Sequence, residues 1–162
     1  MKQLKLFMDR VLETGTLLSL LGMLSVVTIQ VVARYALPKA PPWTEEASRI
    51  FFVYMVAFAG GLAVKAGAFV AVDTFVTMLP NKLQTVMSIC IHFVTTLFMW
   101  LIAWHALTYI KIGSIQLSPA LRVRMSYVFA STFVVSFFIG LYSAIEGGNN
   151  FLSLKKRGRV TP

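Results

Sequence analysis

Two adjacent carboxylates, Glu45 and Glu46, stand directly before a long apolar run, with Trp43 on one side and Arg49 on the other. In a helix that begins near Thr44, both acids lie in the first turn, where the helix dipole stabilises negative charge. Arg49 follows at i+4 and i+3, so one guanidinium can pair with both carboxylates. The pattern predicts a charged cluster that fixes the start of a helix or contacts a partner protein, and the sequence leaves both possibilities open.

The other residues able to do chemistry do not form a site. His92 and His105 belong to one apolar segment, and their spacing places them on different sides of a helix. They therefore cannot share a metal ion or hold a haem between facing helices, and we expect each to be hydrogen-bonded within the helix bundle. Cys90 is the single cysteine, within an apolar run, which is typical of an inert thiol. With no catalytic motif in the chain, we predict no catalytic residue, no metal and no cofactor.

The composition explains where these residues must sit. The 162 residues are 57% hydrophobic and only 13% charged, which is outside the range of ordinary soluble domains. A membrane-spanning helix needs about 20 mainly apolar residues. We therefore predict an integral membrane protein whose single domain, residues 1–162, has four spans. The predicted spans are residues 14–33, 44–65, 83–110 and 119–145, the last beginning with Ser118 as N-cap and Pro119 at the first helical position.

A shorter amphipathic pattern separates the second and third spans. Apolar residues recur at i, i+3, i+4 and i+7 from Val72 to Leu79, and Asp73 lies on the polar side. A helix over about residues 70–80 is too short to span, so we expect it to lie in the interface plane. The alternative is that it forms the first turn of the third span. The predicted fold class is an all-α integral membrane protein, with four transmembrane helices and a short interfacial amphipathic helix.

The basic charge of the chain, +9 in total, fits a membrane protein better than a nucleic-acid-binding one. Most Lys and Arg residues fall on one side of the membrane if both termini are cytoplasmic, as the positive-inside rule favours. Anionic lipid headgroups are the expected partners of these cations. No basic face with interleaved aromatic residues occurs, so we expect no nucleic-acid binding.

Small residues recur at four-residue intervals in the second and fourth spans. This spacing lets helix backbones approach closely in lipid. The contact predicted is equally consistent with packing inside this chain and with packing against a partner. The residues are Ala59, Ala63 and Gly67 in the second span, and Ser136, Gly140, Ala144 and Gly148 in the fourth.

The chain resembles the small membrane subunit of tripartite ATP-independent periplasmic (TRAP) transporters, the DctQ-like family, in the order and spacing of several short motifs. The resemblance covers about residues 30–82 by motif and the rest by topology. One departure is Phe69, where the family often has a histidine shortly before the Val-Asp pair. The motifs are Arg34-Tyr35, a proline-bearing link, Trp43-Thr44-Glu45-Glu46 with Arg49, Gly60-Gly61, Val72-Asp73 and Leu79-Pro80.

The resemblance implies a four-span, non-catalytic scaffold in the bacterial inner membrane with both termini cytoplasmic. Its partners would be a large membrane subunit, which carries the substrate and sodium, and a periplasmic substrate-binding protein. The substrate would be an organic acid, and the chain is most similar to small subunits of sialic-acid systems.

The alternative function is a self-sufficient, homodimeric four-helix exporter, which needs a membrane-embedded carboxylate. Glu13 and Glu146, at the cytoplasmic ends, are the only acids that the sequence places next to spans. A membrane-bound redox subunit is disfavoured by the lack of ligands.

Overall fold

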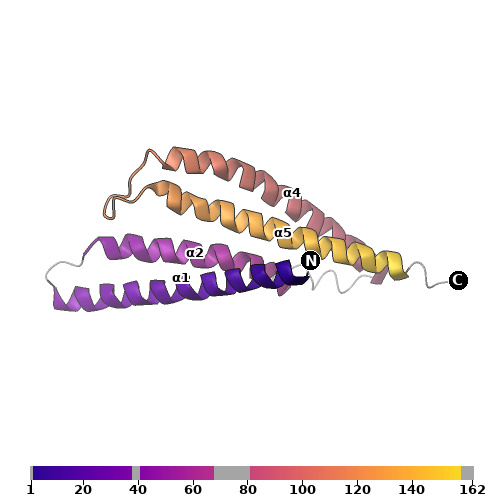
Figure 1. Ribbon diagram of the computed structural model, residues 1–162, viewed down its shortest axis with the longest axis horizontal. Helices are drawn as coiled ribbons and strands as arrows, with labels where there is room; N and C mark the ends of the chain where they lie inside the picture. Colours follow the sequence, from indigo (N-terminus) through magenta and orange to yellow (C-terminus); the bar gives the residue numbers. More distant parts are fainter. Residues whose placement is uncertain (1, 38–40, 68–80, 158–162) are drawn as a thin grey trace.

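The computed structural model describes residues 2–37, 41–67 and 81–157, and the described part folds into long helices (Figure 1). Four of them are long and apolar enough to cross a membrane, which confirms the predicted all-α membrane fold class. The predicted interfacial helix at residues 70–80, and Asp73 with it, lie outside the described residues. The helices are α1 (Lys2–Ala36), α2 (Trp43–Lys65), α4 (Asn81–Gly113) and α5 (Met125–Arg157).

These elements are helical because a chain inside lipid must satisfy its backbone polar groups internally. Three helices are longer than the hydrocarbon core needs: α1 has 35 residues and α4 and α5 have 33 each. At about 1.5 Å per residue they extend roughly 50 Å, against a core of about 30 Å. They must therefore tilt or protrude from the bilayer.

The helices form a row rather than a closed bundle. The substantial contacts join α1 to α2, α2 to α5 and α5 to α4, so the spatial order is α1, α2, α5, α4 (Figure 1). The first residues of α1 and the last residues of α5 lie toward one end of the row, called here the termini end. The α1–α2 link and the α4–α5 loop lie at the opposite end, called here the loop end.

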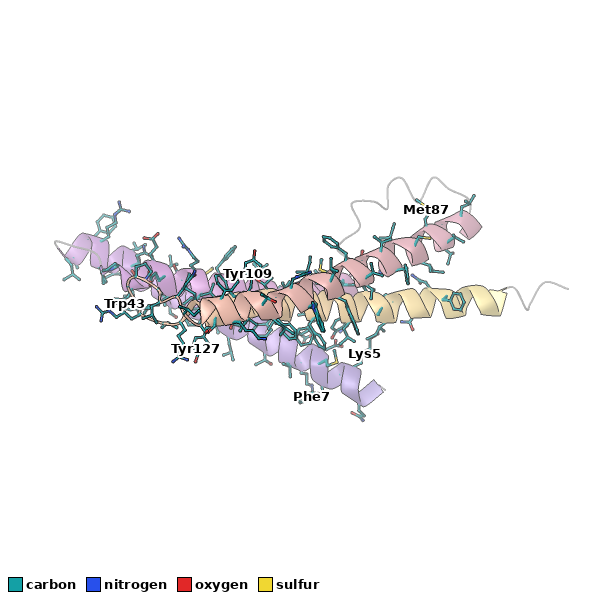
Figure 2. All side chains as sticks on the ribbon, turned by 90° about the horizontal axis from the view of Figure 1, so that it is seen from above. Lys5, Phe7, Trp43, Met87, Tyr109 and Tyr127 are labelled. Atoms are coloured by element: carbon teal, nitrogen blue, oxygen red, sulfur yellow. The ribbon has the colours of Figure 1, made fainter. Side chains whose placement is uncertain are left out.

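An exposed tryptophan and an exposed tyrosine lie at the loop end. Figure 2 places Trp43 and Tyr127 there, whereas Lys5 and Phe7 lie toward the termini end. Trp43 is 40% exposed and Tyr127 is 60% exposed. Such residues are typical of the boundary between hydrocarbon and water, because their rings are apolar and their polar atoms need a partner.

The core of the row is the contact between α2 and α5. Leu12 of α1, Val64 of α2, and Ile139 and Tyr142 of α5 form its buried cluster. Gly61 of α2 allows this close packing, because a Cβ atom there would lie 3.0 Å from Phe138 and 3.1 Å from Leu12. The helices thus meet where one of them lacks a side chain, as is common inside membranes.

A buried polar network fastens the same region. Asp9 of α1 is only 8% exposed. Its carboxylate accepts a hydrogen bond from Lys65 Nζ of α2 at 2.7 Å and another from the Tyr142 hydroxyl of α5. A longer ion pair, 3.5 Å between Lys5 and Glu146, also joins α1 to α5. The network links three of the four helices at the termini end.

Asp9 corrects one statement made from the sequence. Glu13 and Glu146 are not the only acids next to spans. Helix α1 begins at Lys2 and therefore includes Asp9, whose side chain is buried. The charge-free run after Glu13 hid this extension. The carboxylate is nevertheless engaged by Lys65 and Tyr142.

We predict that Tyr142→Phe lowers the stability of the purified protein. The variant removes one donor from a buried carboxylate, and hydrogen bonds to charged groups contribute about 1.5–3 kcal/mol. The measurement is thermal unfolding in detergent. Tyr127→Phe is the matched control, because Tyr127 is 60% exposed. Equal melting temperatures for the two variants would contradict the role assigned to the network.

Candidate functional site

The α4–α5 connection is a compact loop at residues 114–124. Ser118 N–H donates to the Val123 carbonyl at 2.9 Å, and Met125 N–H donates to the Gln116 carbonyl at 2.9 Å. Arg122 takes a left-handed conformation, with φ 53°, which is uncommon outside glycine. The loop is therefore folded on itself.

This loop corrects the predicted start of the fourth span. The helix begins at Met125 and not at residue 119. Ser118 and Pro119 favour a helix N-terminus, but they favour a turn equally well. In this structure the residues form a turn, because the polar groups of the turn have hydrogen-bond partners outside helix α5.

These hydrogen-bond partners are the carboxylate oxygens of Glu46, in the first turn of α2. Its carboxylate accepts hydrogen bonds from the backbone N–H groups of Ala120, at 3.0 Å to the nearer oxygen, and Leu121, at 2.8 Å. The Ser118 hydroxyl donates a third. One half-buried carboxylate thus satisfies the turn that precedes α5, and charged acceptors make the stronger hydrogen bonds. We call Glu46, Ser118, Ala120 and Leu121 the loop clamp.

Two neighbouring contacts support the clamp. The Tyr54 hydroxyl of α2 donates to the Tyr127 carbonyl of α5 at 2.7 Å. Thr44 is fully buried, and its hydroxyl donates to the Pro41 carbonyl at 2.8 Å, which closes the start of α2. The loop end of the α2–α5 contact is therefore held by polar contacts, like its termini end.

The other charged members of the predicted cluster are exposed and, among the described residues, make no hydrogen bond to the loop. Arg49 pairs with Glu45 at 3.9 Å, and both side chains are more than 70% exposed. An exposed pair of this kind contributes about 0.3–0.5 kcal/mol. The structure thus divides the cluster: Glu46 holds the loop, whereas Glu45 and Arg49 lie on the surface. Arg34 is also exposed, in the last turn of α1.

The small residues predicted for helix packing divide in the same way. Gly140 is buried, and a Cβ atom there would lie 2.6 Å from the Trp100 ring of α4. Ser136 is also buried. In contrast, Ala144 and Gly148 are exposed.

On α2 the fully buried residues differ from those that the small-residue spacing selected. The buried residues of its apolar part are Ala57, Gly61 and Val64. Ala59 and Ala63 are half-buried, and Gly67 is exposed with φ 67°. Small residues occur on both sides of this helix, so four-residue spacing alone did not identify the side that faces α5.

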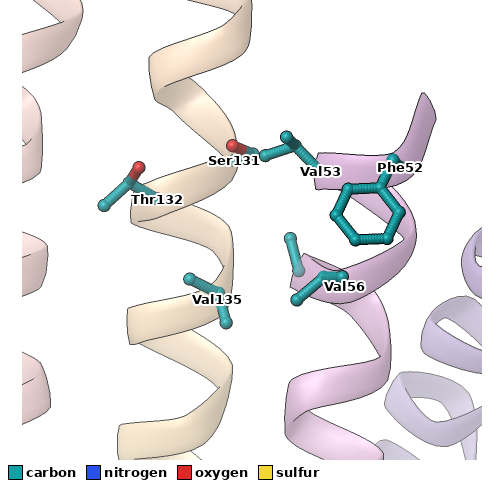
Figure 3. A pocket seen from close by; sticks show the side chains of 7 residues that line it. Phe52, Val53, Val56, Ser131, Thr132 and Val135 are labelled. Atoms are coloured by element: carbon teal, nitrogen blue, oxygen red, sulfur yellow. The ribbon is translucent and has the colours of Figure 1, made fainter. Parts of the chain in front are cut away.

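The groove between α2 and α5 is mainly apolar. A groove of about 160 Å³ lies between α2 and α5, with Val53 and Val56 facing Ser131 and Val135 (Figure 3). Its walls are mainly apolar. Ser131 Oγ donates to the Val128 carbonyl of its own helix at 2.5 Å. The groove thus suits a hydrocarbon chain or an apolar side chain better than an ionic solute.

The two histidines differ in their surroundings. His92 Nδ1 lies 3.0 Å from Ser143 Oγ, beside a cavity of about 260 Å³ between α4 and α5. This contact satisfies the expectation of a hydrogen-bonded histidine. His105 is exposed on α4 instead. Within the described ranges, no three His, Cys, Asp or Glu residues lie close enough to hold a metal ion.

We predict that Glu46→Gln loosens the 114–124 loop. The amide keeps the shape of the side chain but loses its charge, and its nitrogen cannot accept a hydrogen bond from Ser118, Ala120 or Leu121. Backbone amide exchange in the loop should become faster. Glu45→Gln is the matched control and should leave exchange unchanged. If both variants protect the loop as the unaltered chain does, the clamp does not hold it.

Comparisons with known proteins identify the family. The protein-family sequence model for the DctQ component of tripartite ATP-independent periplasmic transporters matches residues 23–148. A TRAP transporter small permease protein of Haemophilus influenzae is 30% identical over 86% of this chain and 87% of its own length. The sialic acid TRAP transporter small permease protein SiaQ of Vibrio cholerae is 29% identical over 51% of this chain and 47% of its own length. The resemblance stated from the sequence is confirmed, and the chain belongs to the DctQ family of TRAP transporter components.

Proposed function

We propose that this chain is the non-catalytic scaffold subunit of a sodium-coupled TRAP importer. It would work with a large membrane subunit that carries an organic acid and sodium, and with a periplasmic substrate-binding protein. Membership of the DctQ family supports the assignment to this type of transporter. The observation that carries the scaffold role is the engagement of the buried and half-buried acids in contacts between helices.

Each of these acids already has a structural partner. Asp9 binds Lys65 and Tyr142, Glu46 binds the α4–α5 loop, and Glu146 lies 3.5 Å from Lys5. A transport site needs ionisable or polar groups that are free to exchange a ligand. The described part of the chain therefore offers little with which to carry an organic anion or sodium by itself.

The arrangement in a row supports the same role. A carrier must surround its solute, whereas the grooves between neighbouring helices here are open and mainly apolar, such as that between Val53 and Ser131. The homodimeric exporter remains the alternative function. It would need a carboxylate that changes protonation in mid-membrane, and the Asp9 carboxylate lies near one end of its span, bound to a cation.

Sialic acid is the substrate we propose for the complex. The supporting observation is the similarity to SiaQ of Vibrio cholerae, whose own name specifies sialic acid. Substrate choice would reside in the large subunit and the binding protein, since three cavities between the helices of this chain have mainly apolar walls.

For orientation, we propose cytoplasmic termini in the bacterial inner membrane. The first residues of α1 and the last residues of α5 lie at the same end of the row, as four spans require. Lys and Arg are enriched at that end in this orientation, in agreement with the positive-inside rule.

Single cysteines in a Cys90→Ser background test this orientation. We expect an impermeant maleimide to label Ser114→Cys, in the α4–α5 loop, in intact spheroplasts. Gln3→Cys, near the start of α1, should react only after the membrane is opened. Both positions are exposed, so accessibility to the reagent differs only through the membrane. Labelling of Gln3→Cys alone in intact spheroplasts would reverse the orientation.

Reconstitution tests the division of labour. In proteoliposomes, we expect sialic acid uptake to require this chain, its large partner, the binding protein and an inward sodium gradient together. Omission of any one component should reduce uptake to the background of empty vesicles. Uptake of another organic acid by the full system would change the substrate and leave the scaffold role intact. Saturable uptake by this chain alone would instead support the exporter.

A further inference from the structure

Helix α4 lies at one edge of the row and is the least covered of the spans. Only 6% of its most apolar 18-residue stretch is buried within the chain, against 33% for the same kind of stretch in α5. Figure 1 shows its place at the edge of the row. Exposure of apolar side chains is ordinary in a membrane, because lipid covers them. The informative groups on α4 are therefore its exposed polar ones.

In the described part of α4 before its last turn, three exposed side chains carry N–H donors. Trp100 is 57% exposed, Trp104 is 74% exposed, and His105 is exposed beside them. Within the part of the chain that the structure describes, none of the three has a hydrogen-bond partner. Trp100 packs its ring onto Gly140 but keeps more than half of its surface open.

Counted along α4 from Lys111, these groups fall at the depth of the hydrocarbon core. Lys111, in the last turn of α4, marks the polar boundary at the loop end. At about 1.5 Å per residue, His105 lies roughly 9 Å and Trp100 roughly 16 Å deeper than Lys111. The half-thickness of the core is about 15 Å. Histidine inside a membrane almost always faces the interior of a helix bundle or a water-filled cavity, and tryptophan favours the membrane–water interfaces.

The opposite edge of the row, formed by α1, has a different surface. Its exposed residues between Leu17 and Ile29 are aliphatic apart from Ser25 and Thr28. Both hydroxyls donate to carbonyls of their own helix at 2.8 Å. Between Leu17 and Ile29 the exposed hydroxyls of α1 are thus satisfied and this stretch suits lipid, whereas the indoles and imidazole on the exposed side of α4 are donors without acceptors among the described residues.

We propose that the α4 edge, defined as Leu97, Trp100, Leu101, Trp104 and His105, is the surface on which the large membrane subunit packs. The partner would present hydrogen-bond acceptors, such as carboxylate, amide or hydroxyl oxygens, to the indole N–H groups and to His105. This assignment rests on the proposed function and names the surface that it uses.

The shape of this region fits a protein partner. A groove of about 210 Å³ runs beside the α4 edge, between Trp100 and Trp104 of α4 and Phe133 and Phe137 of α5. Its apolar walls can receive a side chain of a neighbouring helix.

A second copy of this chain fits the edge less well. In an edge-to-edge pair each copy would bring more N–H donors than acceptors, because an indole only donates and a neutral imidazole accepts at one nitrogen. Some donors would remain without partners in the hydrocarbon. Complementarity therefore favours a different chain that supplies oxygen acceptors.

Photocrosslinking in the assembled complex tests the surface. The photoreactive residue p-benzoylphenylalanine replaces Leu101 on the α4 edge, or Leu21 on α1 as the matched control, since the two leucines are 55% and 59% exposed. We expect an adduct with the large subunit from position 101 and none from position 21. An adduct from position 21 alone, an adduct between two copies from position 101, or no protein adduct from 101 would overturn the proposal.

Copurification of the unaltered chain with the large subunit is measured first, because its absence would contradict the proposed function itself. In a complex that does form, His105→Leu and Trp104→Phe should each lower the yield of complex about three- to tenfold, as expected for one interhelical hydrogen bond in a membrane. Thr28→Val on the α1 edge should leave the yield unchanged. Full yield from both α4 variants would overturn the proposed hydrogen bonding.

Discussion

The contact between α2 and α5 is the constraint on which the rest of the structure depends. It joins the α1–α2 hairpin to the α4–α5 hairpin, and polar groups fasten it at both of its ends. Asp9 binds Lys65 and Tyr142 at the termini end, and Glu46 holds the loop at the other. Helices in lipid gain little from hiding apolar surface from one another. Packing at Gly61 and these few polar contacts must therefore supply the cohesion.

The spans were predictable from the sequence, because length and hydropathy alone decide whether a helix can cross a bilayer. The start of α5 was not, since Ser118 and Pro119 fit a helix N-terminus and a turn equally well. The deciding partner is Glu46, which is 72 residues away from Ser118 in the sequence. Only the tertiary fold brings the two together.

The side of a helix that packs is harder to predict than its ends. On α2, the spacing of Ala59 and Ala63 satisfied the small-residue pattern, but Ala57 and Gly61 are the residues buried against the core. A periodic pattern gives the interval between contacts and not the direction in which they face. Asp9 was missed for a related reason: charge was taken to end a span, whereas a carboxylate with two partners can lie inside one.

The arrangement in a row also has a mechanical consequence. A flat layer resists bending within its own plane far more than out of that plane. The reason is that bending stiffness rises steeply with the dimension along which the load acts. The helices of this chain, ordered α1, α2, α5, α4, form such a layer (Figure 1). A force applied at the α4 edge passes to α5 and from there to both α2 and α1, because α1 also contacts α5 directly. A force on the broad face meets the thickness of one helix. The layer is therefore stiffest against a load directed at its α4 or α1 edge.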